Sequence, residues 1–256
     1  MTRMKPAYGV AVALALVIAG TRLAAAAEEV DLELVLAADG SGSIDDEELR
    51  LQREGYARAL AHPRVLSAIG SGFLGKIAVA FVEWGGPDSQ HIIVDWTIVD
   101  GPESAAAFGA KLLAKPRAAV SYNSISNAIA YSQNLIESND YAGLRRIIDV
   151  SADAGNIGGI PLSVARAQAI VAGITINGLA ISRPGSTRPF RGISLEAHFA
   201  RDVVGGPGAF VVTVDETISF ADAVIKKLVL EIASTPGAPV QIGKLESSLQ
   251  PSKADR

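Results

Sequence analysis

The chain has 256 residues, of which 49% are hydrophobic and 20% are charged, so it is long enough and apolar enough to bury a substantial core. Its formal net charge is -4 and it carries no basic stripe, which argues against nucleic-acid binding. It contains no cysteine, which excludes disulfides, thiolate metal sites and cysteine nucleophiles.

The first residues have the pattern of a secretory signal peptide. Two basic residues precede an apolar run over 8–19, and Ala25 and Ala27 stand at the small positions of an A-x-A cleavage site. The apolar run has roughly a dozen residues, which is short for a membrane span. We therefore expect removal of residues 1–27, a mature protein that begins at Glu28 without a stable membrane span, and a periplasmic or secreted location. An uncleaved membrane anchor or a disordered tail is the alternative.

Strand and helix patterns alternate along the next two hundred or so residues. A continuous apolar run over 30–38 predicts a central strand buried on both faces. Acidic residues at 45–48 predict the first turn of a helix, because the helix dipole favours negative charge there, and His62-Pro63 is expected to end or redirect this helix. The other predicted strands are 76–84, 91–97, 146–150, 175–181 and 210–214, and the other predicted helices are 104–114, 128–136, 161–172, 195–202 and 218–233.

This alternation predicts an α/β fold, with one doubly wound, Rossmann-like domain over 28–233. The central sheet is expected to be mostly parallel, with helices on both faces. Strand 91–97 is expected to pair antiparallel with 76–84 across a short turn and to lie at the edge of the sheet. Residues 234–256 are dominated by Pro, Gly, Ser and charge, which predicts a flexible C-terminal tail.

Three polar loops follow predicted strands or precede predicted helices. The first, Asp39-Gly40-Ser41-Gly42-Ser43, places oxygen side chains on alternate residues, so that the three can point the same way. The other two are 121–126 and 151–156. Loops of this kind gather at the carboxyl ends of the strands in a doubly wound sheet. Oxygen ligands without nitrogen or sulfur suit Mg²⁺, Mn²⁺ or Ca²⁺.

The Asp39-Gly40-Ser41-Gly42-Ser43 loop after an apolar strand resembles the metal-ion-dependent adhesion site of von Willebrand factor A-type domains. The resemblance covers about 30–233. Four stretches also look like those of a group of uncharacterised bacterial proteins of this fold: Leu51-Gln52-Arg53-Glu54-Gly55-Tyr56, Ala80-Phe81-Val82-Glu83-Trp84, Ile148-Asp149-Val150-Ser151 and Thr175-Ile176-Asn177-Gly178-Leu179.

The resemblance implies a von Willebrand factor A-type fold and a bound divalent cation, Mg²⁺ before Mn²⁺ or Ca²⁺. Ser41 and Ser43 would bind the cation directly, and the two aspartates would supply charge and orientation. An open coordination position would accept an Asp or Glu carboxylate from a protein partner. The implied metal site consists of Asp39, Ser41, Ser43, Asn123 and Asp153.

The sequence departs from the family pattern at two positions of this site. Asn123 stands where the family has a threonine. Its amide oxygen is an acceptable hard ligand, although Ser121 or Ser124 could take its place. Ala154 stands where glycine usually follows the aspartate, which could alter the loop.

Enzymatic alternatives lack the residues that their chemistry needs. Neither Ser41 nor Ser43 lies in a G-x-S-x-G motif, and no histidine has a triad-like context, which argues against a serine hydrolase. Metal-assisted phosphoester hydrolysis usually needs a further carboxylate or a lysine, and neither is evident. We therefore expect a non-enzymatic interaction module. The remaining alternative is a metal-free structural or envelope-associated protein in which Asp39 and Ser43 merely cap the following helix, with Asp39 bonded to loop amides.

Overall fold

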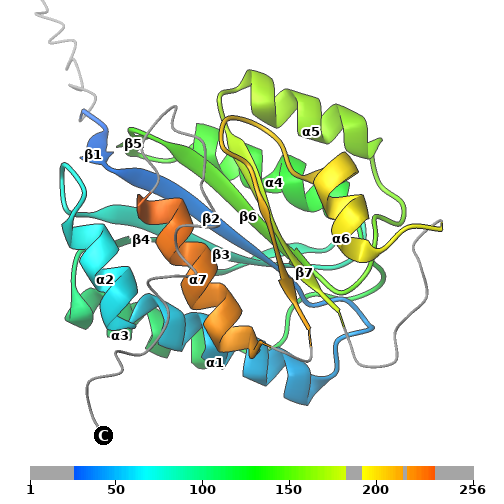
Figure 1. Ribbon diagram of the computed structural model, residues 1–256, viewed down its shortest axis with the longest axis horizontal. Coiled ribbons are helices and arrows are strands. Elements are labelled where there is room, and N and C mark those ends of the chain that lie inside the picture. Colours follow the sequence, from blue (N-terminus) through cyan, green and yellow to red (C-terminus); the bar gives the residue numbers. More distant parts are fainter. Residues whose placement is uncertain (1–25, 183–191, 216–217, 234–256) are drawn as a thin grey trace, which may run out of the picture.

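The computed structural model describes residues 26–182, 192–215 and 218–233, and its centre is a six-stranded sheet (Figure 1). The strands are β2 (Leu32–Asp39), β3 (Ile77–Trp84), β4 (Gln90–Val99), β6 (Arg146–Ala152), β7 (Thr175–Ile181) and β8 (Val211–Val214). Their order across the sheet is β4-β3-β2-β6-β7-β8. Every neighbouring pair is parallel except β3 with β4, which confirms the predicted antiparallel strand at the edge.

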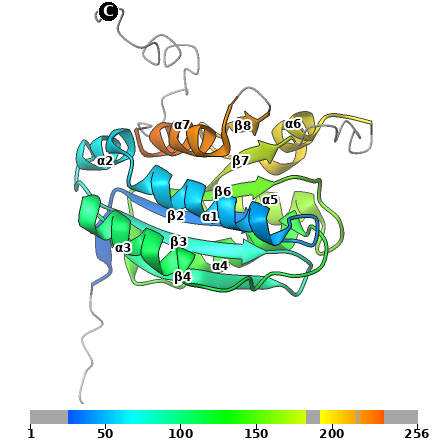
Figure 2. The same ribbon diagram turned by 90° about the horizontal axis from the view of Figure 1, so that it is seen from below.

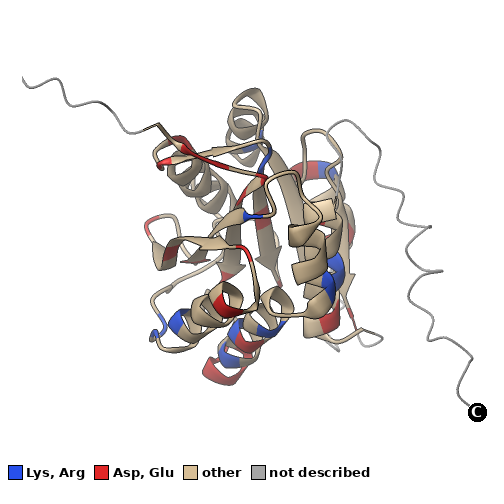
Figure 3. Ribbon diagram, turned by 90° about the vertical axis from the view of Figure 1, so that its left-hand side faces the viewer, with Lys and Arg blue, Asp and Glu red and all other residues tan. Residues whose placement is uncertain are grey.

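Helices cover both faces of the sheet, as Figure 2 shows in the view from below. One layer contains α1 (Asp46–Leu60), α2 (Pro63–Gly70), α3 (Pro102–Leu113) and α7 (Phe220–Ala233), and the other contains α4 (Ile125–Glu137), α5 (Leu162–Val171), α6 (Leu195–His198) and the π-helical turn η1 (Phe199–Val203). The predicted doubly wound α/β class is therefore confirmed. Both signs of charge occur on the same helices, as Figure 3 shows for α1 and α3.

The central strand β2 explains why the two layers are held together. All eight of its residues are buried. Leu34 and Leu36 enter the core beneath α1 and α7, whereas Val35 and Ala37 enter the core beneath α4 and α5. Because alternate side chains of a strand point to opposite faces, an unbroken apolar run fills both cores at once.

Two parts of the fold differ from the sequence prediction. His62-Pro63 does redirect the chain, but a second helix begins there: the backbone N–H of Arg64 donates to His62 Nδ1 (3.2 Å), and Pro63 occupies the first helical position, where its missing N–H costs nothing. A small parallel sheet of β1 (Glu28–Val30) and β5 (Tyr141–Gly143) is also present. Strands of three residues are too short for their periodicity to be recognised in a sequence.

The predicted signal peptide lies almost entirely outside the described residues, and so does the predicted tail over 234–256. Among the helices that the structure describes, none combines the length and the apolar character needed to cross a bilayer.

A group of buried charges connects α7 to the sheet. Lys227 Nζ lies 2.6 Å from Asp149 Oδ1 of β6 and also pairs with Glu231, and all three side chains are almost completely buried. Asn177 Nδ2 of β7 donates to Glu231 Oε1 (2.9 Å). One ammonium group faces two carboxylates, so one carboxylate is left without a balancing charge. Burial, together with the charge of Asp149, raises the pKa of Glu231 to about 7, although Lys227 opposes the rise.

This raised pKa predicts a pH-dependent stability. Below the ordinary Glu231 pKa of 4.5, the folded and unfolded states both hold the proton. Between pH 4.5 and about 7 only the folded state still holds it, so the unfolding free energy should fall by about 1–3 kcal/mol across this window. Urea unfolding at pH 5 and pH 7.5 measures the fall, and Glu231→Gln should reduce it. An equal fall in the variant would assign the pH dependence to other groups.

Candidate metal centre

One glycine lets the β2–α1 loop pass close to the end of β3. Asp39 ends β2, and its Oδ1 accepts a hydrogen bond from the backbone N–H of Ser41 (2.8 Å). A Cβ at Gly40 would lie 2.5 Å from Cγ of Glu83, which leaves no room for any other residue. The loop is therefore packed tightly against Glu83 directly before Ser41.

The five predicted ligands form one connected cluster. Ser41 Oγ lies 3.1 Å from Ser43 Oγ and donates to Asn123 Oδ1 (3.3 Å). Ser43 Oγ donates to Asp153 Oδ1 (3.0 Å). Asn123 Nδ2 donates to Asp39 Oδ2 (2.5 Å). Residues that lie far apart in the chain thus meet at the carboxyl edge of the sheet.

The spacing of these oxygens suits a small divalent cation. Mg²⁺ holds oxygen ligands at about 2.0–2.1 Å in octahedral geometry, so neighbouring ligands are about 3 Å apart. The side-chain oxygens of three pairs, Ser41–Ser43, Ser41–Asn123 and Ser43–Asp153, are 3.0–3.3 Å apart. The hydrogen bonds between these side chains give the same spacing as shared coordination of a cation. Asp39, Ser41 and Asn123 are buried, whereas Ser43 is exposed, so the cluster opens to solvent on one side.

The electrostatics of the cluster also fit a cation. Burial raises the pKa of Asp39 to about 7; the N–H of Ser41 lowers it, and the charge of Asp153 adds to the rise. Within the described part of the chain, no lysine or arginine forms an ion pair with Asp39. A divalent cation would supply the positive charge that this buried carboxylate lacks. The residues present therefore fit a divalent metal.

The alternative residues of the second loop have other contacts. Ser124 Oγ lies near Ser126 Oγ (3.5 Å) and Gly158 O (3.4 Å). Ser121 offers its backbone oxygen to the N–H of Gly42 (2.7 Å). The side-chain oxygen that reaches Ser41 from this loop belongs to Asn123.

Helix capping is not the role of Asp39 or Ser43. The N-cap of α1 is Asp45, whose carboxylate accepts from the N–H of Glu48 (2.8 Å), while the Glu48 side chain accepts from the N–H of Asp45 (2.9 Å). This reciprocal pair satisfies the start of the helix. Neither Asp39 nor Ser43 is therefore the N-cap of α1, whereas the expected bond of Asp39 to a loop amide is present at the N–H of Ser41 (2.8 Å).

Sequence reasoning did not identify the residues that hold the site in shape. The Arg117 guanidinium donates to the carbonyls of Gly40 (3.1 Å), Ser41 (3.4 Å) and Ile44 (2.5 Å), which ties the β2–α1 loop from outside. The carboxylate of Glu83 at the end of β3 is buried against Arg53. No motif marks such contacts, because each joins segments that are distant in the sequence.

The loop after Asp153 is attached to the second loop and the start of α4 by several hydrogen bonds. The N–H of Ser126 donates to Asn156 Oδ1 (2.9 Å), the N–H of Ile157 donates to Asn123 O (2.6 Å), and the N–H of Ile160 donates to Asn127 Oδ1 (3.0 Å). The second and third loops of the site therefore behave as one unit.

Residues 29–236 match the model of a family described as proteins of unknown function, DUF1194. No curated protein matches the chain.

Solved structures share the fold at low identity. Proximal thread matrix protein 1 from the mussel byssus has a TM-score of 0.58 and 13% identity, over 81% of this chain and 50% of that chain. The pilus adhesin SpaC from Lactobacillus rhamnosus GG has a TM-score of 0.56 and 13% identity, over 80% and 31%. A von Willebrand factor type A structure from Catenulispora acidiphila has a TM-score of 0.50 and 14% identity, over 80% and 42%. The chain thus spans half or less of the length of these proteins.

Proposed function

Because the chain belongs to DUF1194, a family of proteins of unknown function, and has a von Willebrand factor A-type fold, we propose that it is a non-enzymatic protein-interaction module. The module binds an Asp or Glu carboxylate of a protein partner through a divalent cation. The proposed metal ligands are Asp39, Ser41, Ser43, Asn123 and Asp153.

The observation that carries this proposal is the composition of the oxygen cluster. Two carboxylates balance the charge of a divalent cation, while the hydroxyls and the amide oxygen are neutral and leave the cation able to attract a further anion. The exposed side at Ser43 gives that anion access. A carboxylate from another protein is the hard, negatively charged ligand that such a position prefers.

The preferred cation is Mg²⁺, with Mn²⁺ or Ca²⁺ as alternatives. One structure of the mussel protein, with a TM-score of 0.54 and 11% identity over 81% of this chain and 49% of that chain, has zinc in its MIDAS motif. That finding supports a divalent cation in general. The cluster here offers oxygen ligands, which favour Mg²⁺ over zinc.

Exposed apolar side chains beside the cluster support a protein partner. Four apolar residues in or next to the second and third loops are exposed: Val120 (61%), Tyr122 (52%), Ile157 (47%) and Ile160 (37%). Apolar side chains around an open polar site are typical of a surface that another protein covers.

The contacts of the histidines support a binding role rather than hydrolysis at Ser41 or Ser43. His62 caps α2, His91 Nε2 lies 3.2 Å from Ser89 Oγ, and His198 is held by Asp202 and Asn156. We further propose that the module acts in the periplasm or outside the cell after removal of residues 1–27, on the basis of the signal-peptide pattern.

Capture experiments test this function. Immobilised protein that begins at Glu28 should retain a specific envelope protein in Mg²⁺, and EDTA should release it. Ser41→Ala should fail to retain the same protein, because it removes a direct metal ligand. Asp88→Ala is the matched control, since Asp88 is an exposed acid in the turn between β3 and β4. Retention that is unaffected by EDTA and by Ser41→Ala would contradict the proposal.

A further inference from the structure

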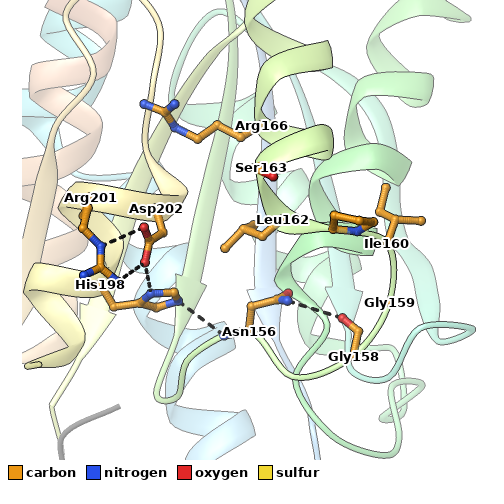
Figure 4. A pocket seen from close by; sticks show the side chains of 11 residues that line it. Asn156, Gly158, Gly159, Ile160, Leu162, Ser163, Arg166, His198, Arg201 and Asp202 are labelled. Atoms are coloured by element: carbon orange, nitrogen blue, oxygen red, sulfur yellow. Dashed lines mark hydrogen bonds and ion pairs between the residues drawn. The ribbon is translucent and has the colours of Figure 1, made fainter. Parts of the chain in front are cut away.

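A hollow of about 590 Å³ lies between α5 and the α6–η1 segment. Figure 4 shows Arg166 and Ser163 of α5 on one side and His198, Arg201 and Asp202 on the other. Asn156 lines its floor and belongs to the loop that also carries Asp153. The hollow and the proposed metal ligand Asp153 thus share one loop.

The charges of the hollow leave one arginine unbalanced. Arg201 pairs with Asp202 through two hydrogen bonds, Nε to Oδ1 (2.9 Å) and Nη2 to Oδ2 (2.7 Å). His198 Nδ1 lies 2.8 Å from Asp202 Oδ2, and the N–H of Asn156 donates to His198 Nε2 (3.4 Å). Arg166 forms no ion pair with any acid in the described part of the chain, so the hollow carries a net positive charge.

The position of Arg166 is fixed while part of its guanidinium stays available. Its Nε donates to the carbonyl of Val204 (2.7 Å), which anchors the side chain between α5 and the end of η1. Within the described residues, no hydrogen bond uses its Nη atoms. A guanidinium that is held by one nitrogen and open at the others is suited to a charge-assisted hydrogen bond with an anion.

The start of α5 adds donors next to this arginine. Its N-cap is Pro161, which provides no capping side chain. Val164 and Ala165 donate to Pro161 O, whereas the N–H groups of Leu162 and Ser163, both at the wall of the hollow, have no hydrogen bond to a described residue. Free N–H groups at a helix start favour a negative ligand.

We propose that this hollow is a second anion subsite, which takes an acidic side chain of the same partner that donates a carboxylate to the metal. The proposal rests on the proposed function for the identity of the partner. Arg166 binds the acidic group, and the N–H groups of Leu162 and Ser163 help to orient it. The partner is therefore expected to present two acidic residues rather than one.

Backbone-amide NMR titration in EDTA tests the subsite without the metal. The probe is the capped dipeptide N-acetyl-Glu-Glu-amide at constant ionic strength, and uncharged N-acetyl-Gln-Gln-amide is its control. We expect saturable shifts of the Leu162 and Ser163 amides with the acidic probe alone. Arg166→Ala should weaken this binding about tenfold or more, because it removes a charge-assisted bond.

Two variants distinguish a subsite from general electrostatics. Asp202→Asn should tighten binding a few-fold, because it removes a negative charge and frees Arg201 while keeping an acceptor for His198. Arg58→Ala, which removes an exposed arginine at the end of α1, should leave binding unchanged. Equal shifts with both probes, or equal weakening by Arg58→Ala and Arg166→Ala, would overturn the proposal.

The same variants separate this inference from the proposed function. Ser41→Ala should still bind the acidic probe, because that serine belongs to the metal cluster. Arg166→Ala should still bind Mg²⁺. Loss of probe binding only in Arg166→Ala supports the subsite even if no metal binds, whereas Mg²⁺ binding without any probe binding rejects the subsite alone.

Discussion

Replacing Asp39 by alanine is expected to weaken Mg²⁺ binding by about 100-fold or more, because it removes one of the two carboxylates that balance the cation. Calorimetric titration of the protein beginning at Glu28 with Mg²⁺, Mn²⁺ and Ca²⁺ measures this effect. The unsubstituted protein should bind about one equivalent, as expected for a single site. Since Asp39 is buried and bonded to Ser41 and Asn123, the variant's fold must be checked by circular dichroism.

Two controls make this result specific. Asp88→Ala removes an exposed acid and should leave the affinity unchanged. Asp39→Asn keeps the acceptor for the N–H of Ser41 but not the charge, so it should bind Mg²⁺ nearly as weakly as the alanine variant. Unchanged affinity in both Asp39 variants would place the cation elsewhere or show that the cluster binds none.

Lys227→Met is expected to destabilise the protein by about 3–5 kcal/mol, because it leaves Asp149 and Glu231 buried without their cation. Thermal unfolding should show a loss on the order of 10 °C. Lys226→Met, the adjacent lysine on α7, is the matched control and should cost far less, since Lys226 is only partly buried.

A combined variant separates lost charge pairing from poor packing of the new methionine. Adding Asp149→Asn and Glu231→Gln to Lys227→Met removes both uncompensated carboxylates. This triple variant should recover more than half of the lost stability. If it is no more stable than Lys227→Met, the shape of the lysine, rather than its charge, is what the core requires.

The fold could be predicted from the sequence because its strong signals are local. The apolar run of β2 and the strand–helix alternation identified the sheet and its two helical layers. Most predicted elements agree with the structure to within a few residues at each end. The short β1 and β5 strands were missed because three residues show no periodicity, and α2 was missed because Pro63 was interpreted as the end of a helix rather than the beginning of the next.

The candidate site could be predicted only in its ligands. The spacing of Asp39, Ser41 and Ser43 is a local pattern, and the resemblance supplied Asp153 and Asn123. The contacts of Arg117 with the first loop depend on tertiary structure, and so does the pairing of Asp149 with Lys227. Asp149 stands within the predicted strand 146–150, and its partner Lys227 lies on the last described helix, far away in the sequence.

The position of β2 in the sheet has a consequence for how the chain folds. This strand comes early in the sequence, but one of its two edges is completed by β6, where Glu33 lies beside Arg146. Closing so long a stretch of chain is entropically costly, and parallel pairings between distant segments form slowly. The amino-terminal half must therefore wait, with an open strand edge, for the carboxyl-terminal half.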